Sequence, residues 1–237
     1  TPEYELDRKR LASGEPLGYV IGSQPFLGLK IYLDSKPLIP RPETEWWTEQ
    51  LLQSVRNTRE RLTEERTERD GARLLDLCAG SGAIGCAALK ILPYMEVFFS
   101  EIDSSHEMTI LKNIRENGLD ESRAFVRIGD LFEPFGNMTF DIIAANPPYV
   151  PAKRELPESV AKHEPAGALF AGDEGLDVIR RIAAELPRRL SRGGVAWIEC
   201  DSAHAAAACA LFKAAGLSAE IRTDQYGAPR LIVVSFS

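Results

Sequence analysis

The sequence has few of the residues that build metal centres and disulfide frameworks. Its 237 residues include four cysteines and three histidines, and no two cysteines form a Cys-x-x-Cys pair. Cys86, Cys200 and Cys209 stand among apolar or small residues, which favours buried, reduced thiols over disulfides or metal ligands. We therefore expect no metal site and an intracellular compartment.

Long hydrophobic runs and an excess of basic residues are also missing. No apolar run approaches the ~18 residues of a membrane span, and no charged-then-apolar leader opens the chain. Acidic residues outnumber basic ones 35 to 28, for a formal charge of −7. This balance disfavours a DNA or RNA substrate, because nucleic-acid binders usually carry a basic face. We expect no membrane partner, a monomer, and a place in the bacterial cytosol, or in mitochondria if the source is eukaryotic.

The chain divides into three regions by composition and pattern. Residues 1–22 predict the end of a helix and a linker, and because the first residue is Thr1 rather than Met, a lost N-terminal segment stays open. Residues 23–71 predict a short β-hairpin turned at Gly28, a proline-rich segment, a helix to about Val55 and a charged connector. Residues 72–237 form the largest region, the expected catalytic domain, with enough hydrophobic residues for a sizeable core.

The third region alternates strand-like and helix-like runs. Strands are expected at 73–78, 96–102, 124–128, 140–145, 194–200, 217–223 and 230–236, and helices at 83–91, 105–117, 176–190 and 203–215. This alternation predicts an α/β fold with a doubly wound, mainly parallel sheet. No helix separates the last two strands, so they predict a C-terminal antiparallel hairpin.

The run 140–145 ends abruptly at Asn146-Pro147-Pro148-Tyr149. Proline cannot donate to a sheet, and it pushes the preceding residue toward extended backbone. Asn146 and the Pro147 carbonyl are therefore expected at the end of a buried strand, on the sheet edge where ligands bind in open α/β folds.

A glycine-rich stretch follows the first strand of this region. Gly80, Gly82 and Gly85 satisfy the G-x-G-x-x-G pattern, and Glu101 lies 21 residues after Gly80, where it suits the hydroxyl pair of a ribose. Taken alone, this would equally support a nicotinamide-dependent oxidoreductase. A carboxylate at Asp76, at the mouth of the loop, would repel a pyrophosphate but suit the ammonium group of S-adenosylmethionine. Asp130 can accept from an adenine amino group, with Leu131 beside the ring.

The four residues Asn146-Pro147-Pro148-Tyr149, called the tetrad below, suit methyl transfer to a planar NH₂ group. The Asn146 side-chain oxygen and the Pro147 carbonyl can accept its two N–H bonds, which aims the nitrogen lone pair at a sulfonium methyl. Tyr149 can cover the flat face of an amide or a base. The same logic serves the amide of glutamine and the exocyclic amine of adenine, so the tetrad does not choose between them.

Several segments together resemble the HemK/PrmC protein-(glutamine-N5) methyltransferases. They are Gly14 to Gly22, Phe26, Ile39 to Glu45, the glycine loop, the tetrad, Glu164-Pro165, Ala168-Leu169 and Gly175-Leu176-Asp177. The proline-rich segment Pro40-Arg41-Pro42-Glu43-Thr44 is more specific to that family than the tetrad. Nucleic-acid amino-methyltransferases share the tetrad.

The resemblance implies a seven-stranded S-adenosylmethionine-dependent methyltransferase core of Rossmann-like type. It implies S-adenosylhomocysteine as product, and as substrate the glutamine of the Gly-Gly-Gln motif of peptide chain release factors. A ribosomal-protein glutamine methyltransferase and an adenine N6 methyltransferase are the alternatives within this chemistry.

The predicted site residues fall into three sets. The catalytic residues are Asn146, Pro147 and Tyr149. Substrate binding adds Pro148, Pro40, Arg41 and Glu43. The cofactor-binding set comprises Asp76, Cys78, Ala79, Gly80, Gly82, Ile84, Glu101, Ile102, Asp130, Leu131, Asn146 and Thr44.

Two departures from the family pattern stand out. Cys78 occupies a position where the family usually has glycine, which is expected to narrow the loop slightly. The helical N-terminal domain that grips the release factor is expected to survive only as a remnant in residues 1–13.

Overall fold

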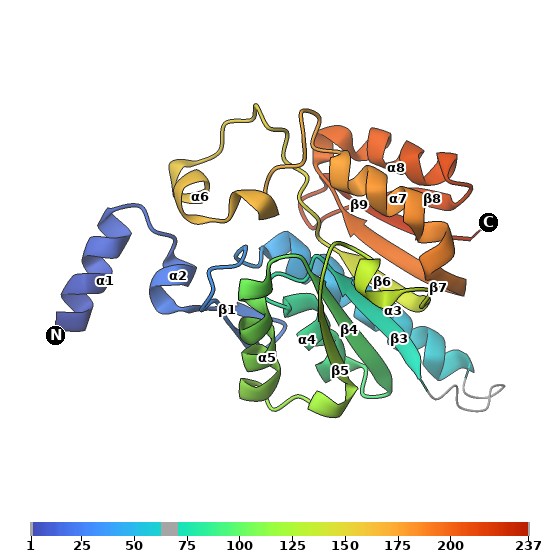
Figure 1. The fold of residues 1–237 in the computed structure, drawn as a ribbon, viewed down its shortest axis with the longest axis horizontal. Coiled ribbons are helices and arrows are strands. Elements are labelled where there is room, and N and C mark those ends of the chain that lie inside the picture. Colours follow the sequence, from blue (N-terminus) through green and yellow to red (C-terminus); the bar gives the residue numbers. More distant parts are fainter. Residues whose placement is uncertain (1, 63–70, 237) are drawn as a thin grey trace.

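The computed structural model describes residues 2–62 and 71–236 of the chain (Figure 1). Its smaller sheet is an antiparallel hairpin of β1 (Ser23–Phe26) and β2 (Leu29–Tyr32). The side-chain oxygens of Asn113 and Asn117 accept hydrogen bonds from the backbone N–H groups of Tyr32 and Lys30, respectively. Asn113 belongs to the helix α5 (Glu107–Glu116) and Asn117 follows directly after it. These hydrogen bonds attach the hairpin to α5, beside the large sheet.

The large sheet has seven strands in the order β5-β4-β3-β6-β7-β9-β8. Their bounds are β3 (Ala72–Leu77), β4 (Met95–Glu101), β5 (Ala124–Ile128), β6 (Phe140–Ala145), β7 (Leu190–Glu199), β8 (Ser218–Thr223) and β9 (Pro229–Ser235). The strands β3 to β7 pair in parallel, whereas β9 pairs antiparallel with both β7 and β8. The predicted mainly parallel seven-stranded sheet with a C-terminal antiparallel hairpin is confirmed.

Helices cover both faces of this sheet (Figure 1). The helices α3 (Pro42–Leu62), α4 (Ala83–Ile91) and α5 (Glu107–Glu116) pack on one face, with the hairpin, around a core that includes Trp47 and Phe99. The helices α7 (Asp177–Arg189) and α8 (Ala205–Ala214) pack on the other face around Phe140 and Phe212. The carboxyl ends of the parallel strands are left uncovered at one edge.

The remaining elements are the N-terminal helix α1 and several shorter helices. They are α1 (Pro2–Ala12), α2 (Leu17–Ile21), α6 (Glu158–His163) and the 3₁₀ helices η1 (Ser104–His106), η2 (Glu121–Arg123), η3 (Glu133–Phe135), η4 (Ala166–Ala168) and η5 (Ser202–His204). In the described part of the chain, none of the helices has both the length and the apolar character needed to cross a membrane.

Two boundaries differ by four residues or more from the sequence-based expectation. The prediction that the helix of the second region ends near Val55 is wrong, because α3 continues to Leu62 through arginine and glutamate residues that favour helix. The strand β7 begins at Leu190, four residues before the expected start at Gly194. Residues 63–70 of the predicted connector lie outside the described residues.

Candidate active site

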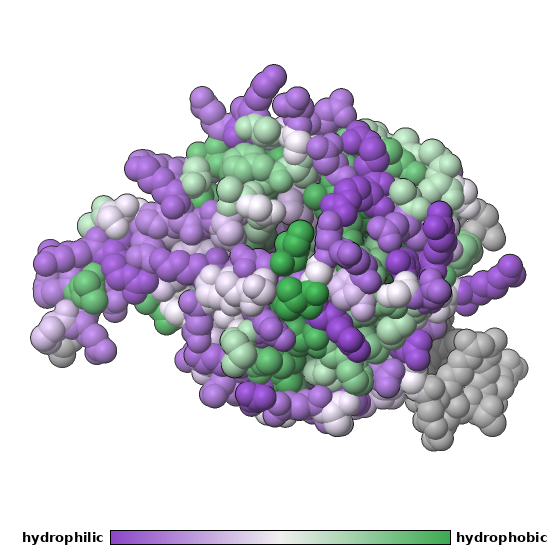
Figure 2. Space-filling model, viewed as in Figure 1, coloured by the Kyte–Doolittle hydropathy of each residue, from purple (hydrophilic) through white to green (hydrophobic). Residues whose placement is uncertain are grey.

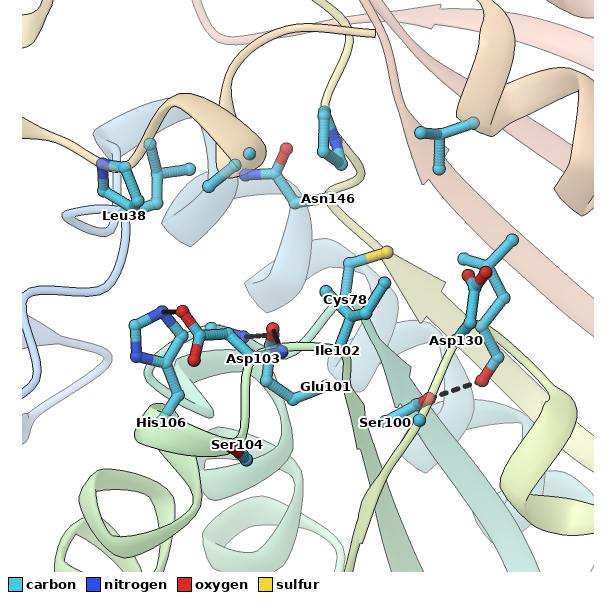
Figure 3. A pocket seen from close by; sticks show the side chains of 18 of the residues that line it. Leu38, Cys78, Ser100, Glu101, Ile102, Asp103, Ser104, His106, Asp130 and Asn146 are labelled. Carbon is cyan, nitrogen blue, oxygen red and sulfur yellow. Dashed lines mark hydrogen bonds and ion pairs between the residues drawn. The ribbon is translucent and has the colours of Figure 1, made fainter.

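A cavity of about 550 Å³ opens at the carboxyl edge of the sheet (Figure 3). On the face drawn in Figure 2, hydrophobic residues gather around a hollow between the α6 segment and α5. The cavity is lined by Leu38, Cys78, Gly80, Ser100, Glu101, Ile102, Asp103, Ser104, His106, Gly129, Asp130, Leu131, Asn146, Pro148, Pro165, Gly167, Ala168, Val178 and Arg181. Most of these residues follow the ends of β3, β4, β5 and β6, as expected for a ligand site in this class of fold.

The glycine loop needs its glycines for two different reasons. Gly80 and Gly82 have positive φ angles of 55° and 76°, a conformation that glycine adopts without steric cost. Gly85 has no such angle, but a Cβ there would lie 2.2 Å from the ring of Phe99 in β4. Gly80 and Gly82 therefore shape the turn, and Gly85 lets α4 pack closely on the sheet.

Cys78 also has a positive φ, of 62°, although it is not glycine. This backbone conformation is strained for a residue that has a Cβ. The side chain lines the cavity, and burial raises the pKa of its thiol, so the group is a neutral thiol rather than a reactive thiolate.

Glu101 is fixed at the end of β4 by two backbone donors. Its Oε2 accepts from the N–H of Gly80 at 2.7 Å, and its Oε1 accepts from the N–H of Asp103 at 2.9 Å. Each carboxylate oxygen keeps a further lone pair for a ligand. Ile102, 67% exposed, and Leu131 line the same cavity and offer apolar surface to a flat ring.

Asp76 does not lie at the mouth of the loop. Its side chain is fully buried beneath the loop, where Oδ2 accepts from the N–H of Gly85 at 2.8 Å. Its Oδ1 has no hydrogen-bond partner among the described residues. Burial raises the pKa of Asp76 to about 8, so this carboxyl group would gain from a cationic ligand nearby.

Asp130 already has a partner. Its carboxylate forms an ion pair of 2.6 Å with Arg181 of α7, and this contact raises the pKa of Arg181. Both side chains line the cavity. Contact between Asp130 and an adenine amino group would share the carboxylate with Arg181.

Asn146 connects the cavity to a buried chain of hydrogen bonds. In Figure 3 it lies across the cavity from Glu101, with Cys78 between them. Its Nδ2 donates to Thr44 Oγ1 at 3.2 Å, and Thr44 Oγ1 donates to Oε2 of Glu199 at 2.7 Å. Glu199 also accepts from Trp47 Nε1 at 2.7 Å and from the hydroxyl of Tyr149 at 2.8 Å.

The proline-rich segment is attached to the far side of the cavity by Glu164. The carboxylate of Glu164 forms an ion pair of 2.5 Å with Arg41 and accepts from the N–H of Ile39 at 3.1 Å. Leu38 and Pro165, which flank these contacts, both line the cavity. The ion pair therefore holds together the segments that carry Leu38 and Pro165 at one side of the cavity.

The structure brings part of the predicted set to the cavity wall. Those lining it are Cys78, Gly80, Glu101, Ile102, Asp130, Leu131, Asn146 and Pro148. The other predicted residues are not among those that line it, and the contacts proposed for them remain predictions: Asp76, Ala79, Gly82, Ile84, Thr44, Pro147, Tyr149, Pro40, Arg41 and Glu43. Among the residues described, no cluster of three or more His, Cys, Asp or Glu side chains could hold a metal ion.

Glu199, Glu164 and Arg181 were missed by the sequence-based prediction. A signal for Glu199 exists, because it ends an apolar strand at the carboxyl edge as Glu101 does. No comparable signal marks Arg181, which lies within an amphipathic helix whose polar residues are mostly exposed.

The chain is similar to known methyltransferases in sequence. The family described as methyltransferase small domain matches residues 56–163. Release factor glutamine methyltransferases of Chlamydia trachomatis, Deinococcus radiodurans and Thermodesulfovibrio yellowstonii are 33%, 32% and 33% identical to it. The alignments cover 88%, 94% and 97% of this chain, and 68%, 76% and 79% of the relatives.

Solved structures share the fold at lower identity. The hMettl16 catalytic domain in complex with MAT2A 3'UTR hairpin 1 matches with a TM-score of 0.63 at 18% identity, covering 89% of this chain and 76% of that one. A Thermus thermophilus 16S rRNA N2 G1207 methyltransferase in complex with AdoMet and guanosine matches with a TM-score of 0.53 at 18% identity, covering 91% and 50%. These likenesses concern the fold, whereas the sequence relatives match along nearly the whole chain: it belongs to the release factor glutamine methyltransferase family.

Proposed function

We propose that this protein transfers a methyl group from S-adenosylmethionine to the side-chain nitrogen of a protein glutamine. The proposed substrate is the glutamine of the Gly-Gly-Gln motif of a peptide chain release factor. One observation carries the proposal: Asn146 of the tetrad lines the same cavity of about 550 Å³ as Cys78 and Glu101. A methyl donor and its acceptor would meet there.

The residues present fit the proposed cofactor. Glu101 would hold the ribose hydroxyls, and Ile102 and Leu131 would flank the adenine ring. The buried Oδ1 of Asp76, which lacks a partner among the described residues, fits a cationic ligand above it. The chemistry that the cofactor supplies is an electrophilic methyl group on a sulfonium.

On the acceptor side, the protein's task is to prepare a poor nucleophile. The lone pair of an amide nitrogen is delocalised, as the ~18–20 kcal/mol barrier to amide rotation shows. The Asn146 side-chain oxygen and the Pro147 carbonyl would accept its two N–H bonds and stabilise the positive charge that grows on nitrogen. By analogy with oxyanion-hole donors, each such contact is worth ~3 kcal/mol.

The proposed methyl transfer needs no basic side chain to remove a proton. The glutamine nitrogen forms the new C–N bond while the methyl–sulfur bond breaks, and the sulfur keeps the electron pair as S-adenosylhomocysteine. The protonated amide is acidic enough to pass its extra proton to water. Tyr149 is proposed to cover the flat face of the substrate amide.

The site of action follows from this substrate. Release factors act where translation occurs, so we infer that the protein works in the cytosol if its source is bacterial, or in mitochondria if its source is eukaryotic. Its net charge of −7 supports a protein substrate over a nucleic acid.

The test is methyl transfer from labelled S-adenosylmethionine. The acceptors are a release factor, the same factor with the motif glutamine replaced by alanine, a glutamine-bearing ribosomal protein, and duplex DNA. We expect label only in the release factor with its glutamine intact. Label in DNA alone, or equal label in the alanine variant, would overturn the proposal.

A further inference from the structure

Glu199 lies at the end of β7, next to the active site but outside the cavity wall. The residue is 1% exposed, and its two carboxylate oxygens accept three hydrogen bonds from two separate parts of the chain. Two donors, Thr44 and Trp47, belong to the first turns of α3, and the third is Tyr149 of the tetrad. Nothing in the proposed methyl transfer requires a buried acid at this place.

The carboxylate of Glu199, in its ionised form, sets the direction of the hydrogen bonds that lead to Asn146. It has no hydrogen of its own, so the single hydroxyl hydrogen of Thr44 must point at Glu199 Oε2. The Thr44 oxygen can then only accept, and it meets the NH₂ group of Asn146 at 3.2 Å. A flipped Asn146 amide would place two acceptors together, so the Asn146 oxygen is left free for a ligand.

The pKa of Glu199 is raised overall, chiefly because the carboxyl group is buried. The donors Trp47, Thr44 and Tyr149 and the charge of Arg230 act in the opposite direction and favour the ionised form. Trp47 offers only a donor, and it shares Oε2 with Thr44, which suits a carboxylate oxygen with two lone pairs.

We propose that Glu199 is a positioning residue that fixes the orientation of the Asn146 amide through Thr44. The inference rests on the proposed function, since the freed Asn146 oxygen is the group assigned to accept an N–H of the substrate. Glu199 is buried and its carboxylate is occupied by Thr44, Trp47 and Tyr149, so it is not placed to act as a base. Its role is to keep the donor end of the Asn146 amide away from the substrate NH₂.

The first test compares two buried threonines on α3. Thr44→Val removes the hydroxyl that links Asn146 to Glu199. Thr48→Val makes the same chemical change at a fully buried hydroxyl that has no partner among the described residues. We expect kcat to fall about 10- to 100-fold for Thr44→Val, the scale of a misplaced substrate contact. For Thr48→Val we expect kcat within about twofold of wild type.

Further variants separate positioning from packing. Thr44→Ser keeps the hydroxyl and should restore kcat. Because Thr44 does not line the cavity and its hydroxyl contacts Glu199 and Asn146, the dissociation constant for the cofactor should stay within about twofold in all threonine variants, against the cofactor contact predicted for Thr44 from the sequence. Glu199→Met removes the acceptor and should lower kcat as Thr44→Val does. Glu199→Gln should lower it less, because the Gln oxygen can still meet Trp47 and Thr44. Full turnover by Thr44→Val or Glu199→Met would overturn the proposal.

A second measurement needs no turnover. In ¹⁵N-resolved NMR of the cofactor-bound protein, the Asn146 side-chain NH₂ is identified by its loss in Asn146→Ala. One of its protons should be protected from solvent exchange in wild type and in Thr48→Val, and should lose that protection in Thr44→Val. Equal exchange in all three overturns the positioning role. Absence of methyl transfer to any release factor would instead sink the proposed function and leave this result standing.

Discussion

The two sides of the cavity are built differently. On the cofactor side, Cys78, Gly80 and Glu101 are held by backbone conformation and by hydrogen bonds within neighbouring strands and their loops, such as that from Gly80 to Glu101. On the acceptor side, Asn146 is held by side chains from distant parts of the chain, since Thr44 is 102 residues away and Thr44 and Glu199 are 155 apart. The first side depends on local geometry and the second on long-range packing.

This difference separates two kinds of failure. Damage to the cofactor side should appear as lost cofactor affinity or as strain in the loop, whereas damage to the acceptor side should spare cofactor binding and lower the rate of transfer. Mutations that change one quantity without the other therefore test whether the two sides are independent.

The largest effect is expected at Asn146 itself. Asn146→Ala removes the oxygen proposed to accept a substrate N–H, and transfer should fall by about 10³-fold, at the upper end of such losses. Isothermal titration should show that the cofactor still binds. Retained turnover would refute the role of Asn146, and lost cofactor binding would show that the two sides are coupled.

Gly85→Ala should damage the cofactor side through packing. The new Cβ would lie 2.2 Å from the buried ring of Phe99, and we expect a loss of about 2–3 kcal/mol in the free energy of unfolding. Gly167→Ala is the matched control, because a Cβ at Gly167 meets nothing within 4 Å and the backbone is ordinary. Urea denaturation would decide, and equal stability of the two variants would contradict this packing.

Asp76→Asn tests the buried acid beneath the glycine loop. The pKa of Asp76 is raised to about 8 in the folded protein, against roughly 3.9 in an unfolded chain. Its contribution to stability is therefore present below about pH 4 and is lost as the pH rises toward about 8. Without cofactor, the asparagine variant should lose less stability than wild type between pH 5 and 8.

The same variant should bind the cofactor more weakly if Asp76 attracts its ammonium group. Thermal denaturation at several pH values measures the pH dependence of stability, and a binding titration measures the affinity for the cofactor. Parallel stability profiles for variant and wild type would contradict the raised pKa, and unchanged affinity would contradict the cofactor role.

The smallest effect is expected at Cys78. Its φ of 62° is unfavourable for any residue with a Cβ, by about 1–2 kcal/mol. Glycine removes this strain but raises the entropy of the unfolded chain, so Cys78→Gly should be more stable than Cys78→Ala by about 0.5–1 kcal/mol. Both variants lack the thiol, so the comparison isolates the backbone. Equal midpoints in urea would argue against strain at this position.

The positions of several cofactor-side residues could be predicted from the sequence, although Asp76 was expected at the mouth of the loop and is buried. Glu101 ends β4 and Asp130 follows β5, and the fold places the carboxyl ends of parallel strands at one edge. Local patterns were sufficient here because strand ends and glycine turns are determined by neighbouring residues. The binding roles assigned to these residues remain predictions.

The acceptor side could be predicted only in part. The tetrad marks Asn146, but no spacing along the chain shows that the hydroxyl of Thr44 turns toward Glu199 rather than into the cavity. The end of α3 at Leu62 was missed for a related reason, since a run of mixed charges suits both an exposed helix and an irregular segment. Such choices are decided by tertiary contacts, which a local pattern does not contain.

The position of β9 has a consequence for how the protein is made. This strand, Pro229–Ser235, is the last described element of the chain, yet it lies inside the sheet between β7 and β8. It pairs with the end of β7 at Glu199, opposite Leu231. While the chain leaves the ribosome, the cofactor side can form early. The strand that carries Glu199 gains its second neighbour only after β9 has been synthesised, so we expect the cofactor side to form before the acceptor side is complete.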